Sequence, residues 1–440
     1  MTDATAARVM LWGTQVGAVL WDPQRESALF EYDDRFLAAP VELAPLMMPK
    51  RKGVYSFSGL PKETFKGLPG MLADALPDKF GNLLIDQWLT ATGRDRASFD
   101  PVQRLCYIGS RGMGALEFEP VLSNPQVASE KLLFDELVSL AEQALHSKGA
   151  LATRLEAGQE DKAVQQIISV GTSAGGARAK AVIAYNAATQ EIRSGQLQAP
   201  AGFSHYLLKL DVSGNSDKEG EDPPAYGRIE YAYYLMARAA GIDMSECRLL
   251  EHNGRAHFMT QRFDRLENGS KLHMQSLCAI GHYDFNAAGG YAYEQAMDVI
   301  RRVITDPGLQ RTALVQQFRR AVFNVVARNQ DDHTKNIAFL MDRRGVWRLS
   351  PAFDVTYSYN PEGAWTSRHQ MTINQQRDGF TLDDLLALGA KANLKKATAR
   401  AEIDQIVTVV RQQWPSCAAA AGVREQAARA IAAQHRLHFD

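Results

Sequence analysis

The sequence predicts an α+β protein, with strands concentrated in its first half and helices in its second. The first thirty-odd residues alternate apolar and polar side chains, and Gly13 and Asp22 mark turns, which is typical of a short β-meander. From about residue 290 onward apolar residues recur at helical spacing, interrupted by one predicted β-hairpin at 337–350. A chain of 440 residues is long enough for two or three domains, or for one bilobal protein with a cleft.

The composition is that of an ordinary globular protein and argues against several functional classes. Lys and Arg number 49 and Asp and Glu 50, so the formal charge of -1 gives no global electrostatic case for nucleic-acid binding. The four cysteines are widely scattered, which argues against a disulfide framework and a structural zinc site. We expect no signal peptide and no membrane-spanning stretch, so the predicted location is the cytoplasm.

Polar groups gather at the open end of the predicted hairpin. Its two strands flank the turn Asp-Arg-Arg-Gly, in which Gly345 can adopt a positive φ. Pairing about this turn places residue 336 roughly opposite residue 351, so Asn336 and Asp354 return to the same end, beside Asp331. Carboxylate and carboxamide oxygens suit Mg²⁺, so this end of the hairpin is a predicted Mg²⁺ site.

The same groups match the spacing of a protein-kinase catalytic loop. Asp331 precedes Asn336 by five positions, as in the pattern D-x-x-x-x-N. In that template the Asp accepts the proton of the substrate hydroxyl, the Asn holds one Mg²⁺, and an Asp beyond the hairpin, here Asp354, holds both metal ions. Asp and Asn are also common in turns and caps, so the spacing alone does not establish catalysis.

A kinase also needs a glycine loop over the phosphates and a lysine that reaches them. The glycine-rich segment 171–180 lies between two strand-like runs, but it matches neither the Walker A nor the G-x-G-x-x-G pattern. Lys209 lies in the apolar strand HYLLKLD, where burying an unpaired ammonium is costly, and Glu230 in the next helix is its candidate partner. Two alternatives stay open, namely a flexible hairpin tip at 171–180 and an edge-strand Lys209.

These segments together resemble the HipA family of serine/threonine kinase toxins from bacterial type II toxin–antitoxin modules. The resemblance rests on GLPGMLADALPDKFGN, GTSAGGARAKAVIA, YLLKL, QRFDR, DDHTKN and LSPAFDVT, in this order over nearly the whole chain. It implies a bilobal, protein-kinase-like fold. The implied parts are a β-rich N-terminal subdomain (1–125), an ATP-binding N-lobe (126–265) and a mainly helical C-lobe with the catalytic loop and metal-binding hairpin (266–440).

The resemblance implies roles toward ATP and Mg²⁺. Asp331 becomes the catalytic base, and Asn336 and Asp354 become Mg²⁺ ligands. Lys209 becomes the lysine that contacts the phosphates. The implied nucleotide-binding residues are Lys209, Ser173, Gly175, Gly176, Lys180, Glu230, Gln261, Phe263 and Asp264.

Within that set, the strand from Gln261 to Phe263 is expected to hold the adenine through backbone hydrogen bonds, and Asp264 to lie near the ribose. Family members inactivate themselves by phosphorylating a serine in the glycine loop. Here the best match is Ser173, with Thr172 beside it and Lys180 closing the loop.

The resemblance also implies partners. Family substrates include aminoacyl-tRNA synthetases, and a small helix-turn-helix antitoxin, HipB-like, neutralises the toxin. The pair contacts operator DNA mainly through the antitoxin, which agrees with the absence of a basic surface signal here.

The sequence departs from the eukaryotic kinase pattern near the predicted base. Asn329 and Gln330 replace His-Arg before Asp331, and Val355 replaces the Gly that usually follows the metal-binding Asp. His333 stands where most eukaryotic kinases have Lys. We expect His333 either to lie near the transferred phosphoryl group or to brace the loop.

Three other functions remain open at this point. One is a small-molecule kinase of the aminoglycoside-phosphotransferase type, which uses similar chemistry. Another is a catalytically silent partner that binds an antitoxin and helps repress transcription, although the intact Asp, Asn, Asp and Lys set speaks against it. The third is a metal-dependent hydrolase built on Asp331-Asp332-His333, which would leave Lys209 without a role.

Overall fold

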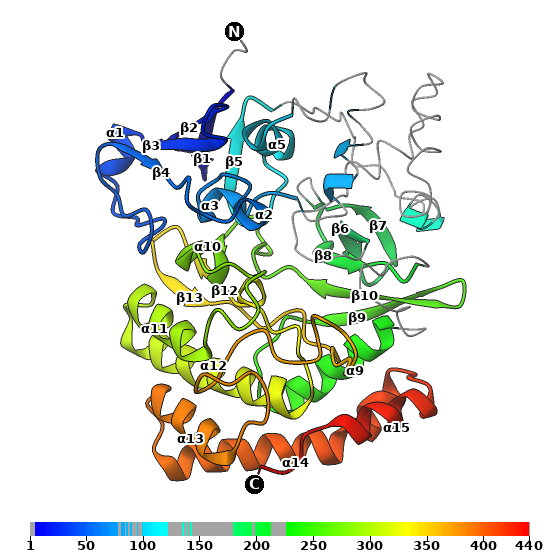
Figure 1. Cartoon of the computed structure of the whole chain (residues 1–440). Helices are drawn as coiled ribbons and strands as arrows, with labels where there is room; N and C mark the ends of the chain where they lie inside the picture. The colour runs from blue at the N-terminus through cyan, green and yellow to red at the C-terminus, as the bar shows by residue number, and fades with distance from the viewer. Residues whose placement is uncertain are drawn as a thin grey trace. The chain divides into compact units, whose positions relative to one another are not determined.

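Helices and sheets are both present, as the predicted α+β class requires. The computed structural model describes residues 5–77, 99–121, 179–195, 199–212 and 226–439, with a few more residues within 81–95 and 134–142. It forms two compact units: unit 1 comprises Met1–Asp222 and Met259–Met274, and unit 2 comprises Pro223–Phe258 and Gln275–Asp440 (Figure 1). The predicted domain boundaries at residues 125 and 265 stay predictions.

Unit 1 begins with a five-stranded antiparallel sheet in the order β4-β3-β2-β1-β5. Side chains along β1 alternate between exposed and buried, so one face of the sheet forms a core, and α5 packs on β1, β2 and β5. The first three strands are the meander that the alternation predicts. The elements are β1 (Ala6–Leu11), β2 (Thr14–Asp22), β3 (Ser27–Tyr32), α1 (Asp34–Leu37), β4 (Val54–Ser56), α2 (Lys62–Phe65), α3 (Gly70–Ala73), α5 (Pro101–Ile108) and β5 (Leu116–Glu119).

A second group of strands in unit 1 carries the predicted phosphate lysine. β6 (Lys180–Asn186) lies between β7 (Glu191–Ser194) and β8 (Ser204–Lys209), and both pairings are antiparallel. β10 (Arg255–Gln261), whose last three residues belong to unit 1, lies on the other side of β8. Because β8 is an interior strand, the edge-strand alternative for Lys209 is wrong.

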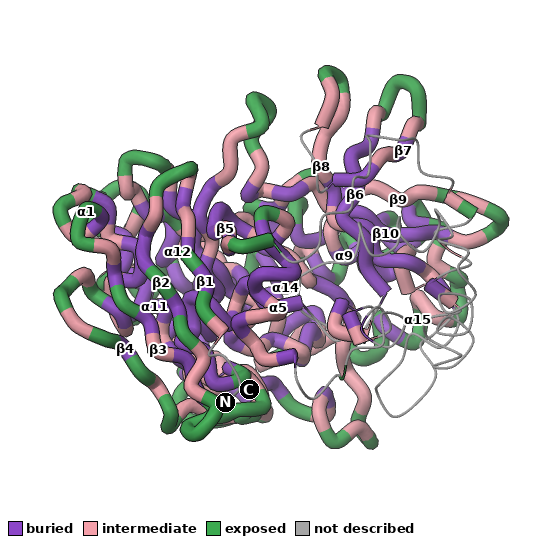
Figure 2. The backbone as a smooth tube through the Cα atoms, turned by 90° about the horizontal axis from the view of Figure 1, so that it is seen from above, coloured by how far each residue is buried: buried purple, intermediate pink, exposed green. Residues whose placement is uncertain are grey.

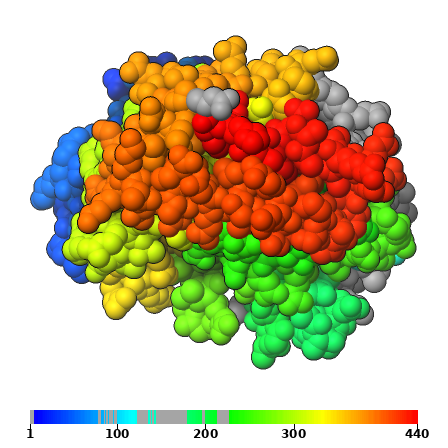
Figure 3. Space-filling model, turned by 90° about the horizontal axis from the view of Figure 1, so that it is seen from below, coloured from blue at the N-terminus to red at the C-terminus, as the bar shows by residue number. Residues whose placement is uncertain are grey.

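Unit 2 is mainly helical. The long helix α14 packs against α9, α12 and α13, and Figure 2 marks the buried residues of the chain in purple. Figure 3 shows the C-terminal helices, in orange and red, covering one face of this unit. The elements are α9 (Tyr226–Ala239), β9 (Cys247–His252), β11 (His273–Ser276, whose first two residues belong to unit 1), α10 (Leu277–Gly281), α11 (Tyr293–Val303), α12 (Pro307–Val326), β12 (Ala338–Met341), β13 (Trp347–Leu349), α13 (Leu382–Lys391), α14 (Lys396–Ala420) and α15 (Glu425–Gln434).

Local sequence signals set the ends of the helices that hold the site. Asp306 caps α12 by accepting hydrogen bonds from the N–H groups of Gly308 and Leu309, and Pro307 occupies the first turn, where its missing N–H costs nothing. Gly241 follows α9 with a φ of 75°, the left-handed conformation in which glycine commonly ends a helix. None of the described helices is long and apolar enough to cross a membrane.

The predicted hairpin is present, but its register differs from the prediction by one residue. Phe339 pairs with Leu349, so the register continues to place Asn336 opposite residue 352 and not 351. The reason lies in the turn, where Asp342 N–H bonds to Val346 O at 3.2 Å and leaves a three-residue loop that ends in Gly345 at φ 80°. Three-residue loops of this kind need a left-handed residue at the end, which glycine provides.

Candidate active site

The predicted catalytic loop joins α12 to β12 within unit 2. After α12 ends at Val326, Arg328 adopts a left-handed φ of 58°, and Asn329 N–H returns to Asn324 O at 2.9 Å. The loop ends in a single 3₁₀ turn, Thr334–Asn336. Backbone bonds therefore hold both ends of the loop.

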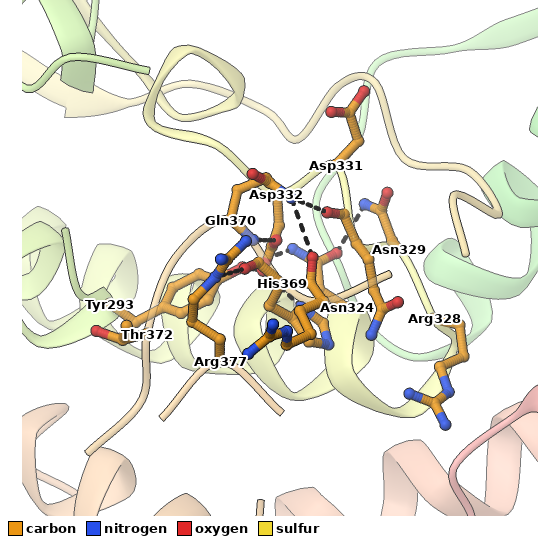
Figure 4. Close-up of polar contacts among 12 residues, drawn as sticks. Tyr293, Asn324, Arg328, Asn329, Asp331, Asp332, His369, Gln370, Thr372 and Arg377 are labelled. Carbon is orange, nitrogen blue, oxygen red and sulfur yellow. Dashed lines mark hydrogen bonds and ion pairs between the residues drawn. The ribbon is translucent and has the colours of Figure 1, made fainter. Parts of the chain in front are cut away.

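Asp331 projects away from the buried polar groups beneath the loop (Figure 4). Its side chain is 23% exposed, and His333 Nε2 lies 4.0 Å from its Oδ1. The indole N–H of Trp365 donates to the same oxygen at 2.6 Å. The predicted base is therefore partly accessible and has one oxygen oriented by a neutral donor.

Asn336 is tied directly to the predicted base. Its Nδ2 donates to the backbone oxygen of Asp331 at 2.9 Å, which closes the D-x-x-x-x-N segment on itself. With the amide nitrogen used in this bond, Oδ1 is the atom of the carboxamide that could act as an oxygen ligand for a hard cation.

Asp332 is buried and organises a polar cluster below the loop (Figure 4). Its Oδ2 accepts hydrogen bonds from Tyr293 Oη at 2.7 Å and from His369 Nδ1 at 2.8 Å. Its Oδ1 accepts the backbone N–H of Gln370 at 2.7 Å. Burial, followed by the charge of Asp332, raises the pKa of Tyr293 well above its usual value, so the phenol stays a donor.

The cluster continues into the end of α12. Asn324 Nδ2 donates to Tyr293 Oη at 2.9 Å, and Asn329 Nδ2 donates to Asn324 Oδ1 at 2.9 Å. On the other side, Arg377 Nε donates to the backbone oxygen of His369 at 2.7 Å. A series of hydrogen bonds thus links the catalytic loop to α11, α12 and the segment after Trp365.

The aromatic ring of Phe285 contacts two residues of the loop. Its centroid lies 5.3 Å from that of His333, and Lys335 Nζ lies 5.3 Å from the same ring. Thr334 Oγ1 donates to the backbone oxygen of Tyr283 at 2.8 Å. His333 therefore packs against Phe285, as expected of a residue that braces the loop, and also lies near Asp331.

Asp354, the second predicted metal ligand, follows β13. It adopts a left-handed φ of 57°, which is uncommon for a residue other than glycine and which Asp tolerates better than most. Its backbone is thereby set in an unusual conformation at the position where the sequence predicts a ligand.

In unit 1, two lysines face each other across neighbouring strands. The register of β6 and β8 pairs Lys180 directly with Lys209, so both side chains lie on the same face of the sheet. They are 4% and 9% exposed. Two cationic residues on one face of a sheet suit the binding of an anion such as a polyphosphate.

The other predicted nucleotide residues have mixed outcomes. Glu230 is 1% exposed in α9. Its predicted pairing with Lys209 stays a prediction, because the two residues belong to different units. The predicted glycine-loop residues Ser173, Gly175 and Gly176 and their neighbour Thr172 lie outside the described residues.

Asp264 does not fit the predicted ribose contact. It is fully buried, and its carboxylate accepts hydrogen bonds from Arg262, Arg265 and Gly114 N–H at 2.7–2.9 Å. Burial pushes the pKa of Asp264 up, but the two guanidinium groups outweigh burial and hold that pKa below its usual value. Its carboxylate is thus used in the interior of unit 1.

Adenine binding by residues 261–263 stays a prediction, but the backbone N–H of one of these residues already has a partner within the sheet. The N–H of Arg262 donates to His205 O at 2.9 Å and is used inside the sheet. Gln261 and Phe263, on either side of it, are both partly exposed.

The donor set at the hairpin fits Mg²⁺ better than a softer metal. Among the described residues, no group of three or more His, Cys, Asp or Glu side chains is placed to hold a metal ion. Asn336 and Asp354 supply oxygen atoms only, and Mg²⁺ usually takes one or two carboxylates together with substrate phosphates and water.

Several residues of this site were missed by sequence reasoning. Trp365, His369 and Gln370 belong to a segment without helical or strand periodicity, and Tyr293 lies in an amphipathic helix where a buried aromatic side chain is ordinary. The sequence offered Asp332 only as part of a possible hydrolase motif, Asp331-Asp332-His333, and gave it no structural role. No short-range spacing rule connects them, since they lie about forty residues apart in the chain.

Comparison with known protein families gives two matches. The model described as "HipA N-terminal domain" matches residues 7–119, and the model described as "HipA-like C-terminal domain" matches residues 172–414. The second match alone covers more than half of the chain.

Two curated relatives from Sinorhizobium fredii (strain NBRC 101917 / NGR234) are similar over part of the chain. "Putative kinase Y4mE" is 28% identical over 161 residues, covering 34% of this chain and 37% of the relative. "Putative kinase Y4dM" is 28% identical over 201 residues, covering 41% of this chain and 47% of the relative. The matched segments thus span less than half the length of these relatives.

A solved structure shares the fold over nearly the whole chain. It is the HipA toxin of Shewanella oneidensis MR-1, determined in a complex of HipA, HipB and operator DNA. The TM-score is 0.67 with 15% identity, and the match covers 97% of this chain and 94% of the other. At this identity the likeness shows the kinase-like HipA fold alone.

Proposed function

Because the chain belongs to the HipA family, we propose that it is an ATP- and Mg²⁺-dependent serine/threonine protein kinase. The observation that carries this proposal is the closed loop in which Asn336 bonds to the backbone of Asp331. This hydrogen bond holds the Asp331 and Asn336 residues of the D-x-x-x-x-N pattern of a kinase catalytic loop close together. The Asp331 side chain projects away from the buried polar groups (Figure 4).

Asp331 is the proposed general base. Its carboxylate would accept the proton of an acceptor hydroxyl as that oxygen attacks the γ-phosphoryl group of ATP. Asn336 and Asp354 would hold Mg²⁺, which neutralises charge on the phosphates when bound. His333, packed on Phe285 and 4.0 Å from the base, would keep the loop in place.

The nucleotide phosphates would be bound by the lysine pair of unit 1. Lys180 and Lys209 are paired in register and both buried, and burial strengthens their attraction for an anion. In the proposed site Glu230 orients Lys209. Gln261 and Phe263 would flank the adenine.

The wider role proposed here is that of a toxin in a HipA/HipB-like toxin–antitoxin module of the cytoplasm. The family membership and the presence of HipB in the Shewanella complex support a helix-turn-helix antitoxin partner. Operator DNA would then be reached through that antitoxin. The proposed substrate is a translation-related protein such as an aminoacyl-tRNA synthetase, and the proposed autophosphorylation site is Ser173, with Thr172 as the alternative.

The direct test is transfer of label from γ-labelled ATP with Mg²⁺, followed by mass spectrometry of the glycine-loop peptide. Labelled Ser173 or Thr172 that disappears in Asp331→Asn would support the proposal. Label on an added aminoglycoside or choline, with none on protein, would favour a small-molecule kinase instead. Neither label nor ATP binding in folded protein would favour a catalytically silent antitoxin partner.

A further inference from the structure

The proposed base is held by a segment that no kinase motif includes. Residues 365–370, here called the clamp segment, contact both acidic residues of the catalytic loop. At its start, Trp365 donates its indole N–H to Asp331 Oδ1 at 2.6 Å. At its end, His369 and Gln370 bind the buried Asp332 at 2.8 and 2.7 Å.

The clamp segment is itself fixed by one side chain. Gln370 Nε2 donates to the backbone oxygens of Arg368 at 3.0 Å and of Gln330 at 3.2 Å, and also bonds to the backbone oxygen of Trp365. A single amide therefore ties the start of the segment to its end and to the residue before Asp331. The position of the Trp365 indole relative to the loop follows from these bonds.

The hydrogen bond from the Trp365 indole can hold the Asp331 carboxylate in one orientation. A carboxylate on a loop rotates about its side-chain bonds, and only some orientations present an oxygen to an attacking hydroxyl. An N–H donor on one oxygen removes that freedom and leaves the second oxygen for the proton to be transferred. The indole is suited to this role because it only donates and cannot compete for the proton.

We propose that Trp365 is a positioning residue for the proposed phosphoryl transfer, acting through its hydrogen bond to Asp331. The inference rests on the proposed function, since it assigns a part in that reaction. Trp365 does not touch the reacting atoms. It fixes one oxygen of the base and, through the clamp segment, couples the base to the buried Asp332.

The test compares Trp365→Phe with the wild type in label transfer from Mg²⁺-ATP. Phe keeps an aromatic ring and loses the N–H, so kcat should fall about tenfold to a hundredfold while the KM for ATP stays unchanged. Trp365→His, which can still donate an N–H, should restore part of kcat.

A matched control separates this role from general stability. Trp414→Phe removes an indole N–H that donates to the Ala428 backbone oxygen at 2.9 Å in the C-terminal helices, and it should leave kcat unchanged. Thermal unfolding of each variant verifies that it is folded. A fall in kcat that Trp365→His does not partly restore, or an equal fall in Trp414→Phe, would contradict positioning of the base.

Label transfer by the wild type distinguishes a failure of the positioning role of Trp365 from a failure of the proposed kinase function. An active wild type with Trp365→Phe equally fast or faster would overturn the positioning role and leave the kinase proposal standing. A wild type that transfers no label, and that Asp331→Asn does not change, would overturn both.

Discussion

Asp331 and Asp332 are adjacent in the chain, yet their carboxylates face opposite environments. Asp331 is 23% exposed and accepts one indole N–H, whereas Asp332 is 1% exposed and accepts three hydrogen bonds from Tyr293, His369 and Gln370. The two side chains project to different sides of the loop (Figure 4). The partly exposed carboxylate of Asp331 can therefore take part in a reaction, whereas the buried carboxylate of Asp332 stabilises the loop.

This division predicts different costs for the same substitution. Asp332→Asn should lower the free energy of unfolding by about 3 kcal/mol, because its amide nitrogen would face donors in a buried site. Asp331→Asn, which is partly exposed, should cost less than about 1 kcal/mol and still abolish turnover. Urea unfolding and label transfer, measured on both variants, check this. Equal destabilisation by the two substitutions would contradict the division of roles.

The lysine pair leads to a prediction about ATP affinity. Lys180→Met and Lys209→Met should each weaken ATP binding about tenfold or more, because each removes a charge-assisted contact with the phosphates. Lys52→Met, at an exposed surface ion pair, should leave the affinity unchanged. Titration calorimetry with Mg²⁺-ATP measures all three. Unchanged affinity in both buried-lysine variants would place the phosphates elsewhere.

The chain segment after α15 is connected to the catalytic loop. Arg436 N–H donates to Val326 O at 2.8 Å, and Arg328 Nε donates to Gln434 O at 2.9 Å, just before the loop begins. Arg436 also forms an ion pair with Asp378. These contacts hold Arg328 in its left-handed conformation.

Shortening the chain should therefore affect activity as well as stability. A chain ending at Ala433 loses both backbone contacts, and we expect the free energy of unfolding to fall by about 2 kcal/mol and turnover to decrease. A chain ending at Leu437 keeps both contacts and serves as the control. Chemical unfolding and label transfer provide the two measurements. A stability loss with full turnover would show that the segment does not position the loop.

The position of the predicted catalytic loop could be found from the sequence, whereas most of the residues that support the loop could not. The spacing of Asp331, Asn336 and the hairpin follows from local rules, so the loop could be placed from the sequence. Trp365 and His369 could not, because they meet the loop only through tertiary packing. Asp264 shows a different limit: the family resemblance implied a ribose contact, whereas burial beside Arg262 gives this carboxylate a structural role.

Asp264 yields a stability prediction. Asp264→Asn would leave two buried guanidinium groups without their carboxylate, and the free energy of unfolding should fall by about 3–5 kcal/mol. Glu119→Gln breaks the Arg8–Glu119 ion pair, whose side chains are 61% and 41% exposed, and should cost less than about 1 kcal/mol. Guanidinium unfolding of both variants tests the contrast. If Asp264→Asn lowered the free energy of unfolding by less than Glu119→Gln does, the buried Asp264 cluster would make no net contribution to stability.

His273 should make the fold sensitive to acid. It is fully buried, and burial lowers its pKa to about 3. The neutral ring is thus favoured in the folded state, while the unfolded chain takes up a proton below its ordinary value of about 6.5. The contribution of His273 to the free energy of unfolding is fully present above about pH 6.5, which is the ordinary pKa of histidine. As the pH falls below it, the free energy of unfolding decreases, by about 2 kcal/mol at pH 5. Urea unfolding at pH 7.5 and pH 5 should therefore show a smaller acid loss in His273→Gln than in the wild type. The exposed His438→Gln is the control, and an acid loss in His273→Gln equal to that of the wild type would contradict the prediction.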